Sequence, residues 1–194
     1  MNIKNYTGLL LLSFFSLIAQ ADYQLDNAAS TLNFVSIKKS KIGEVHSFTQ
    51  FSGRVNEAGL AQLTVNLNSV STGIAIRDQR MKDVLFETKL FHSAAISSQL
   101  NIARVSGLQP GQVLIFDSEF SLALHGQSKL IPVSLQVVGL EKGALLVSSA
   151  QPLVLNAADF SLTKGVQELM MLANLPSIAS AVPVMFSLVF KPTE

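Results

Sequence analysis

Apolar and polar residues alternate along most of this chain, and that alternation limits its fold more than any other feature. Between residues 62 and 68, Leu63, Val65 and Leu67 alternate with glutamine, threonine and asparagine. Successive side chains of a β-strand point to opposite faces, so a period of two predicts a strand with one apolar face. Four later segments repeat this period through Ile96, Leu100 and Ile102; Leu114, Phe116, Phe120, Leu122 and Leu124; Ile131, Val133, Leu135 and Val137; and Val184, Phe186, Leu188 and Phe190.

Glycine-containing turn signals separate these segments, for example at 56–59, 109–111, 125–126 and 141–143. Short strands at intervals of about 8–12 residues are typical of an all-β sandwich or barrel. Residues 31–37 and 44–55 predict two further strands near the start. In the second of these, Phe48 and Phe51 have opposite parity, which predicts a bulge or burial on both faces.

Two segments interrupt the β pattern. Residues 74–87 carry apolar residues at helical intervals, and Asp78 and Lys82 stand in the favourable i,i+4 order, so a short helix is predicted. Residues 166–175 predict either a second short helix or a capping loop, ended by Pro176. The segment 166–176 is rich in methionine and predicts either a lid or a plug at one end of the fold.

The first 21 residues have the order of a secretory signal peptide. Lys4 is followed by the apolar run 9–18 and by Ala19-Gln20-Ala21, which suits a signal peptidase. The run is shorter than the roughly 20 residues that cross a bilayer, although an uncleaved anchor is the alternative. We therefore expect residues 1–21 to be removed, residues 22–194 to form one domain, and the product to be periplasmic where the cell has two membranes.

Composition excludes several kinds of function. The chain has no cysteine, so thiol catalysis and disulfides are excluded, and its 14 basic residues nearly balance 13 acidic ones. No basic cluster is large enough for a nucleic-acid interface. His46, His92 and His125 are far apart, so neither a metal site nor any other cofactor is predicted. The chain has no Gly-x-Ser-x-Gly, His-Glu-x-x-His or P-loop motif, and no catalytic residue is predicted.

Several stretches together resemble the YceI-like family of exported β-barrel proteins, along essentially the whole mature chain. They are Tyr23-Gln24-Leu25-Asp26 with Ser30-Thr31-Leu32-Asn33-Phe34, Phe48 to Gly53, Asn68 to Gly73 leading into Arg77 to Met81, and Leu122 to Gly126 leading into Ile131-Pro132-Val133. The resemblance implies an extended antiparallel lipocalin-like β-barrel with an apolar interior and one or two short helices. Members of the family are associated with binding isoprenoid quinones, polyprenyl chains or related amphiphiles.

Five phenylalanines are the candidate ligand-binding residues if they face one interior: Phe34, Phe116, Phe120, Phe186 and Phe190. The alternative is that they only pack against one another, since apolar side chains are buried by default. Arg77 is a candidate head-group contact at the barrel mouth, because arginine suits phosphate or carbonyl oxygens. The alternative for Arg77 is an ion pair or helix-start contact that fixes its segment to a strand.

The leading hypothesis is a non-catalytic binder or carrier of an isoprenoid quinone, a polyprenyl lipid or a similar apolar molecule, with transient membrane contact. The first alternative is an exported interaction or stress-response protein whose barrel is filled. The second is a hydrolase that uses carboxylates in the barrel, for which Asp117 and Glu119 share a strand parity. The alternative for these two residues is a solvated outer face that alternates with Phe116 and Phe120, and it is the more economical interpretation. An open apolar cavity favours the first hypothesis, and converging titratable groups favour the last.

Overall fold

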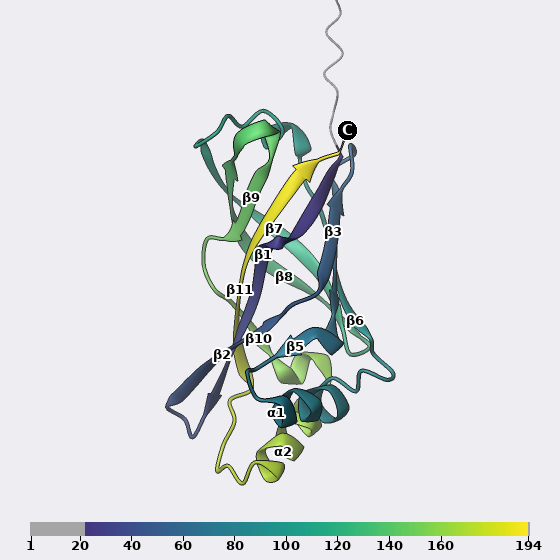
Figure 1. Cartoon of the computed structure of the whole chain (residues 1–194), viewed down its shortest axis with the longest axis vertical. Helices are drawn as coiled ribbons and strands as arrows, with labels where there is room; N and C mark the ends of the chain where they lie inside the picture. The colour runs from purple at the N-terminus through teal and green to yellow at the C-terminus, as the bar shows by residue number, and fades with distance from the viewer. Residues whose placement is uncertain (1–21, 194) are drawn as a thin grey trace, which may run out of the picture.

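The computed structural model describes residues 22–193, so the predicted signal peptide, residues 1–21, lies outside the described residues (Figure 1). The strands and helices follow the chain in the order β1 (Tyr23–Lys38), β2 (Ile42–Phe48), β3 (Phe51–Val55), β4 (Leu60–Asn66), β5 (Val70–Ser71), α1 (Ala75–Arg80), β6 (Ser93–Gln99), β7 (Val113–Leu124), β8 (Gln127–Gly139), β9 (Leu145–Ser149), β10 (Leu153–Asn156), α2 (Thr163–Leu172) and β11 (Ala181–Pro192). Among these residues no helix is both long and apolar enough to cross a membrane.

The strands form one antiparallel sheet that closes on itself. Neighbours follow the order β11, β9, β8, β7, β6, β4, β3, β1, and β1 then pairs with β11. The short strands share positions, because β2 and β3 lie on the same side of β1 while β9 and β10 lie on the same side of β11. The result is a closed eight-stranded barrel with two short helices, which confirms the predicted lipocalin-like architecture.

The parity change between Phe48 and Phe51 arises from a break in the strand. Residues 49 and 50 leave the ladder and bond to Ser69 instead: the amide of Thr49 donates to its carbonyl (3.2 Å) and the amide of Gln50 to its hydroxyl (3.0 Å). The chain then rejoins the sheet as β3, in which the odd-numbered residues face inward, whereas in β2 the even-numbered ones do. The predicted irregularity is therefore a change of hydrogen-bond partner at residues 49 and 50. On either side of it, β2 and β3 run in different directions (Figure 1).

Both predicted helices are present and lie at the same end of the barrel (Figure 1). The first comprises α1 and a π-helical turn, Met81–Leu85, within the predicted range 74–87. The second, α2, begins three residues before the predicted start and resolves the alternative of a capping loop. The two are close, because a Cβ added at Gly165 would lie 2.8 Å from the carbonyl oxygen of Val84.

The opposite end of the barrel is closed by side chains. The 3₁₀ turn Ile102–Arg104 follows β6, and Ile102 and Val105 are buried there. Tyr23, Leu145 and other buried side chains add to the same hydrophobic core. The barrel therefore has one closed end and one end covered by the two helices.

Candidate functional site

The barrel encloses a cavity of about 560 Å³. Its wall is almost wholly apolar and is formed by inward-facing side chains of the barrel strands, together with α1, α2 and the π-helical turn. This volume lies within the range of roughly 300–1,000 Å³ that is usual for pockets binding small organic molecules. The shape of the fold thus provides an internal apolar compartment.

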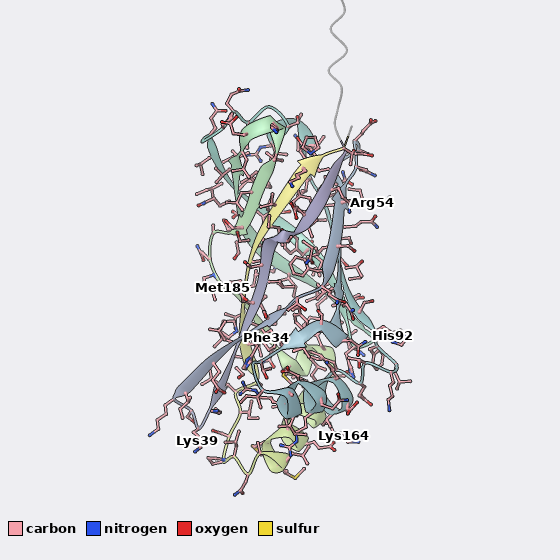
Figure 2. The ribbon with its side chains drawn as sticks, in the orientation of Figure 1. Phe34, Lys39, Arg54, His92, Lys164 and Met185 are labelled. Atoms are coloured by element: carbon pink, nitrogen blue, oxygen red, sulfur yellow. The ribbon has the colours of Figure 1, made fainter. Side chains whose placement is uncertain are left out.

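All five phenylalanines singled out in the sequence line this cavity: Phe34, Phe116, Phe120, Phe186 and Phe190. They also pack against neighbours. The ring of Phe120 lies 6.2 Å from that of Phe186, and the guanidinium of Arg104 lies 5.1 Å from the centre of the Phe116 ring. Phe34 is found toward the helical end (Figure 2). Both interpretations of these residues therefore hold, because they pack together and form the wall of an open space; ligand binding by them stays a prediction.

Strand β7 shows that the interior is not filled. Asp117 and Glu119 point outward and are exposed, whereas Phe116 and Phe120 point inward. These two rings nevertheless keep part of their surface uncovered, and that surface faces the cavity. The first alternative, a filled barrel, does not agree with this arrangement.

The carboxylates proposed for a hydrolase do not lie inside the barrel. Asp117 and Glu119 are on its outer face, and Glu44 is the one acidic residue on the cavity wall within the described part of the chain. A glycosidase-like mechanism requires two carboxyl groups flanking the bond that is cleaved. The second alternative, a hydrolase with carboxylates in the barrel, therefore does not agree with the structure, because the strand alternation turns Asp117 and Glu119 toward solvent.

The cavity reaches the surface beside α1. Ile74 and Ile76 line it and yet are 48% and 60% exposed. Val166 and Leu169 of α2 contribute to the same end of the wall. The segment predicted as a lid or a plug therefore lines the end of the cavity that reaches the surface.

A group of charged side chains lies at this end. Glu44 of β2 accepts from Arg77 of α1 at 2.9 Å and from Lys38 of β1 at 2.8 Å. Arg77 also donates to the carbonyl oxygen of Thr72 (2.7 Å). The pKa of Glu44 is lowered, first by its hydrogen bond to Lys38 and further by the charges of Arg77 and Lys38. Glu44 is therefore ionised, and the ion pair fixes α1 to β2.

The structure thus gives Arg77 the alternative role that the sequence left open, a structural ion pair. Arg77 also borders the cavity, so the proposed head-group contact is not excluded by its position. Its neighbour Asp78 accepts a hydrogen bond from the amide of Thr72 (2.7 Å) and closes the turn before the helix. The contacts of Arg77 leave its Nε atom buried and without a partner among residues 22–193.

His46 is a cavity residue that sequence reasoning missed. It is only 3% exposed, its Nε2 atom lies 2.8 Å from the Ser36 hydroxyl, and its ring packs edge-on against Phe34. Burial lowers the pKa of His46, and the positive charge of Arg77 lowers it further, so the imidazole is neutral near pH 7. The signal was available, because His46 shares its strand parity with Phe48 rather than with the exposed Val45.

The three histidines do not meet. Nδ1 of His92 lies 2.7 Å from the Thr88 carbonyl oxygen, and Nε2 of His125 lies 2.9 Å from Glu87. Within the described range, no three residues of the types His, Cys, Asp and Glu are grouped so that they could hold a metal ion. Each histidine therefore has a separate local environment.

Comparisons with known proteins agree with this architecture. The model of the YceI-like domain matches residues 23–190. A polyisoprenoid-binding domain from Saccharophagus degradans, implicated in plant cell wall breakdown, is 42% identical, with a TM-score of 0.86 over 88% of this chain and 98% of that one. A search of curated proteins gave no match.

Two more distant structures share the fold alone. BcnA of Burkholderia cenocepacia is 19% identical, with a TM-score of 0.65 over 85% of this chain and 98% of its own. The YceI protein of Campylobacter jejuni is 14% identical, with a TM-score of 0.56 over 77% of this chain and 84% of its own.

Proposed function

The chain belongs to the YceI-like family, and we propose that it binds an isoprenoid-like apolar molecule reversibly and without catalysing a reaction. The observation that carries this proposal is the apolar cavity of about 560 Å³ inside the barrel. The 42% identical domain described as polyisoprenoid-binding supports the same class of ligand. An isoprenoid quinone or a polyprenyl lipid has the long apolar chain that such a wall suits.

The energetics of burial favour a long chain. Transfer of one methylene from water gains about 0.8 kcal/mol, so fifteen carbons gain on the order of 12 kcal/mol. Association itself costs roughly 4–15 kcal/mol, so at the low end of that cost a net gain of about 8 kcal/mol remains. Such a gain corresponds to a dissociation constant of about 1 μM, which suits reversible carriage. A wall of this kind selects by length and shape more than by polar contacts.

The absence of catalysis is part of the proposal. A general base needs a polar partner that orients it and a reacting group within hydrogen-bond reach. On the cavity wall His46 contacts a serine and a phenylalanine ring, while Glu44 is occupied by two cations. These groups hold the structure together and are not arranged around a bond to be cleaved.

We extend the proposal to location and to the membrane. Cleavage after Ala21 would release the domain into the periplasm, and the N-terminal sequence of the purified protein should then begin at Asp22. Ile76 and Met171 of the two helices are 60% and 70% exposed at the cavity's open end. Lys39 and Lys164 lie at this same end (Figure 2). Apolar side chains flanked by lysines suit a brief contact with an anionic lipid surface.

The membrane contact is tested by transfer of a fluorescent isoprenoid from anionic vesicles to the protein. Ile76→Ser should slow the transfer several-fold and leave the melting temperature unchanged. Val113→Ser is the matched control, because Val113 is 56% exposed on a barrel strand. Equal transfer rates for both variants would contradict a contact at the helices.

Binding itself is tested by native mass spectrometry of the mature protein purified from its own cells, followed by organic extraction. We expect a stoichiometric isoprenoid-like molecule, lost in Phe120→Asp because the charge would lie in the apolar cavity. Ile115→Asp is the control, since Ile115 lies on the same strand, faces outward and is 57% exposed. An empty protein that also takes up no added quinone or polyprenol would overturn the proposal.

A further inference from the structure

Two buried nitrogen atoms beside the cavity have no hydrogen-bond partner. Across residues 22–193 only three buried side-chain polar atoms are unpaired, namely Nδ1 of His46, Nε of Arg77 and Nδ1 of His125. The first two belong to residues that line the cavity, and the third does not. Leaving such a buried atom unpaired costs free energy, so each one requires an explanation. A ligand in the cavity that hydrogen-bonds to the atom is one such explanation.

The imidazole of His46 is held in place from several sides. Its Nε2 atom bonds to the Ser36 hydroxyl at 2.8 Å, and its ring centre lies 5.2 Å from that of Phe34. Only 3% of the residue is exposed. These contacts therefore hold the ring in place, and Nδ1 is its one nitrogen atom without a hydrogen-bond partner.

The guanidinium of Arg77 is held as firmly. One terminal nitrogen donates to Glu44 at 2.9 Å and the other to the carbonyl oxygen of Thr72 at 2.7 Å. Glu44 and His46 share one face of β2, so the same strand positions both the arginine and the histidine. Nε–H is the donor of Arg77 that stays unused.

The charges at this end favour an uncharged group over a phosphate. The cations of Arg77 and Lys38 already share the carboxylate of Glu44. A diphosphate placed here would have to compete for these two cations with a carboxylate that already lies within 2.9 Å of each. A hydroxyl oxygen can accept from Nε–H and donate to a neutral imidazole nitrogen, and a carbonyl oxygen can accept from both when Nδ1 carries the proton.

We propose that His46 Nδ1 and Arg77 Nε form a head-group site that binds the uncharged oxygen, hydroxyl or carbonyl, at the end of an isoprenoid chain. This inference rests on the proposed function. It adds that the ligand has an uncharged polar head group, and that His46 and Arg77 recognise this group. The apolar wall holds the chain, and the two nitrogen atoms distinguish an oxygen-bearing isoprenoid from a hydrocarbon.

Three ligands with one carbon skeleton test the proposal: phytol, the hydrocarbon phytane, and phytyl diphosphate. Their affinities for the mature protein are measured by displacement of a fluorescent apolar probe. We expect phytol to bind about tenfold more tightly than phytane, from two hydrogen bonds in a poorly solvated site. Phytyl diphosphate should bind more weakly than phytol.

The variants His46→Phe and Arg77→Lys show whether these residues are responsible. His46→Phe keeps a ring against Phe34 and should reduce the preference for phytol from about tenfold to about threefold, because one of the two hydrogen bonds is lost, while phytane binding persists. Arg77→Lys keeps a cation for Glu44 and removes Nε–H, so it reports on the site even if the histidine variant folds poorly. His92→Phe is the control, because His92 lies outside the cavity wall.

The outcomes separate the two proposals. Equal binding of phytol and phytane by the unaltered protein would overturn the head-group site and leave the apolar carrier intact. Tighter binding of phytyl diphosphate would overturn the assignment of an uncharged head group. Binding of none of the three would contradict the proposed function itself.

Discussion

Replacing Ala61 by phenylalanine would distinguish an open barrel from a filled one. Ala61 lies on β4 between Val55 of β3 and Ser98 of β6, and its side chain lines the cavity. A phenyl ring at this position would project into the compartment of about 560 Å³. The substitution therefore adds apolar volume where the structure has space for it.

The sign of the stability change follows from that space. Burying the ring should stabilise the ligand-free protein by about 1–2 kcal/mol after the loss of rotamer freedom. For a domain of this size, each kcal/mol raises the melting temperature by about 2–4 °C. In a filled barrel the same ring would overpack the core and cost about 1–3 kcal/mol. The two interpretations thus predict changes of opposite sign.

The assay is urea and thermal unfolding of the delipidated mature protein, with and without an added isoprenoid. A saturating ligand at a hundred times its dissociation constant stabilises the native state by about 2.7 kcal/mol, and Ala61→Phe should reduce this gain. Ala95→Phe is the control, because Ala95 is exposed on β6 and lies outside the cavity wall. A lowered melting temperature in Ala61→Phe with unchanged ligand stabilisation would refute the reasoning.

Three further predictions follow from single contacts. Arg77→Met removes the bonds to Glu44 and to Thr72, and should lower the free energy of unfolding by about 1–3 kcal/mol in urea denaturation. Because the pKa of His46 is lowered below its ordinary 6.5, the unfolded chain takes up this proton first; stability should therefore fall as pH drops below about 6.5, and less steeply in His46→Phe. Gly165→Ala forces a Cβ to 2.8 Å from a backbone oxygen and should cost about 1–3 kcal/mol, whereas Gly107→Ala, with open space around it, should be neutral in the same assay.

The barrel and its inner face could be predicted because they depend on local alternation. A period of two fixes which side chains share a face, and closure turns that face inward, so the parity of Phe116 and Phe120 was sufficient to place them on the inside. The helical segment 74–87 could also be predicted from a local pattern, because its apolar residues recur at the longer interval of a helix. These features need no knowledge of which strands are neighbours.

The charged group formed by Lys38, Glu44 and Arg77 depends on contacts between distant segments. These residues come from β1, β2 and α1, and no spacing rule joins them. The break at residues 49 and 50 is similar, because its bonds go to Ser69. His46 is an intermediate case: its parity with Phe48 was readable, but its burial depends on Phe34 across the β1–β2 pair. Alternation in the sequence therefore predicts which side chains form the cavity wall. The arrangement of the polar atoms in that wall depends instead on contacts between segments that are distant in the sequence.

The two ends of the cavity have consequences for how a ligand would lie in it. The far end is closed by buried apolar side chains such as Ile102 and Val105, whereas His46 and Arg77 lie at the open end beside α1. A chain whose oxygen binds at these two residues must enter with its apolar tail first, since no unpaired polar atom lines the closed end in the part of the molecule described. Its head would then stay next to the helices, where Ile76 is exposed. Loading and release would therefore take place at the end of the barrel that α1 and α2 cover.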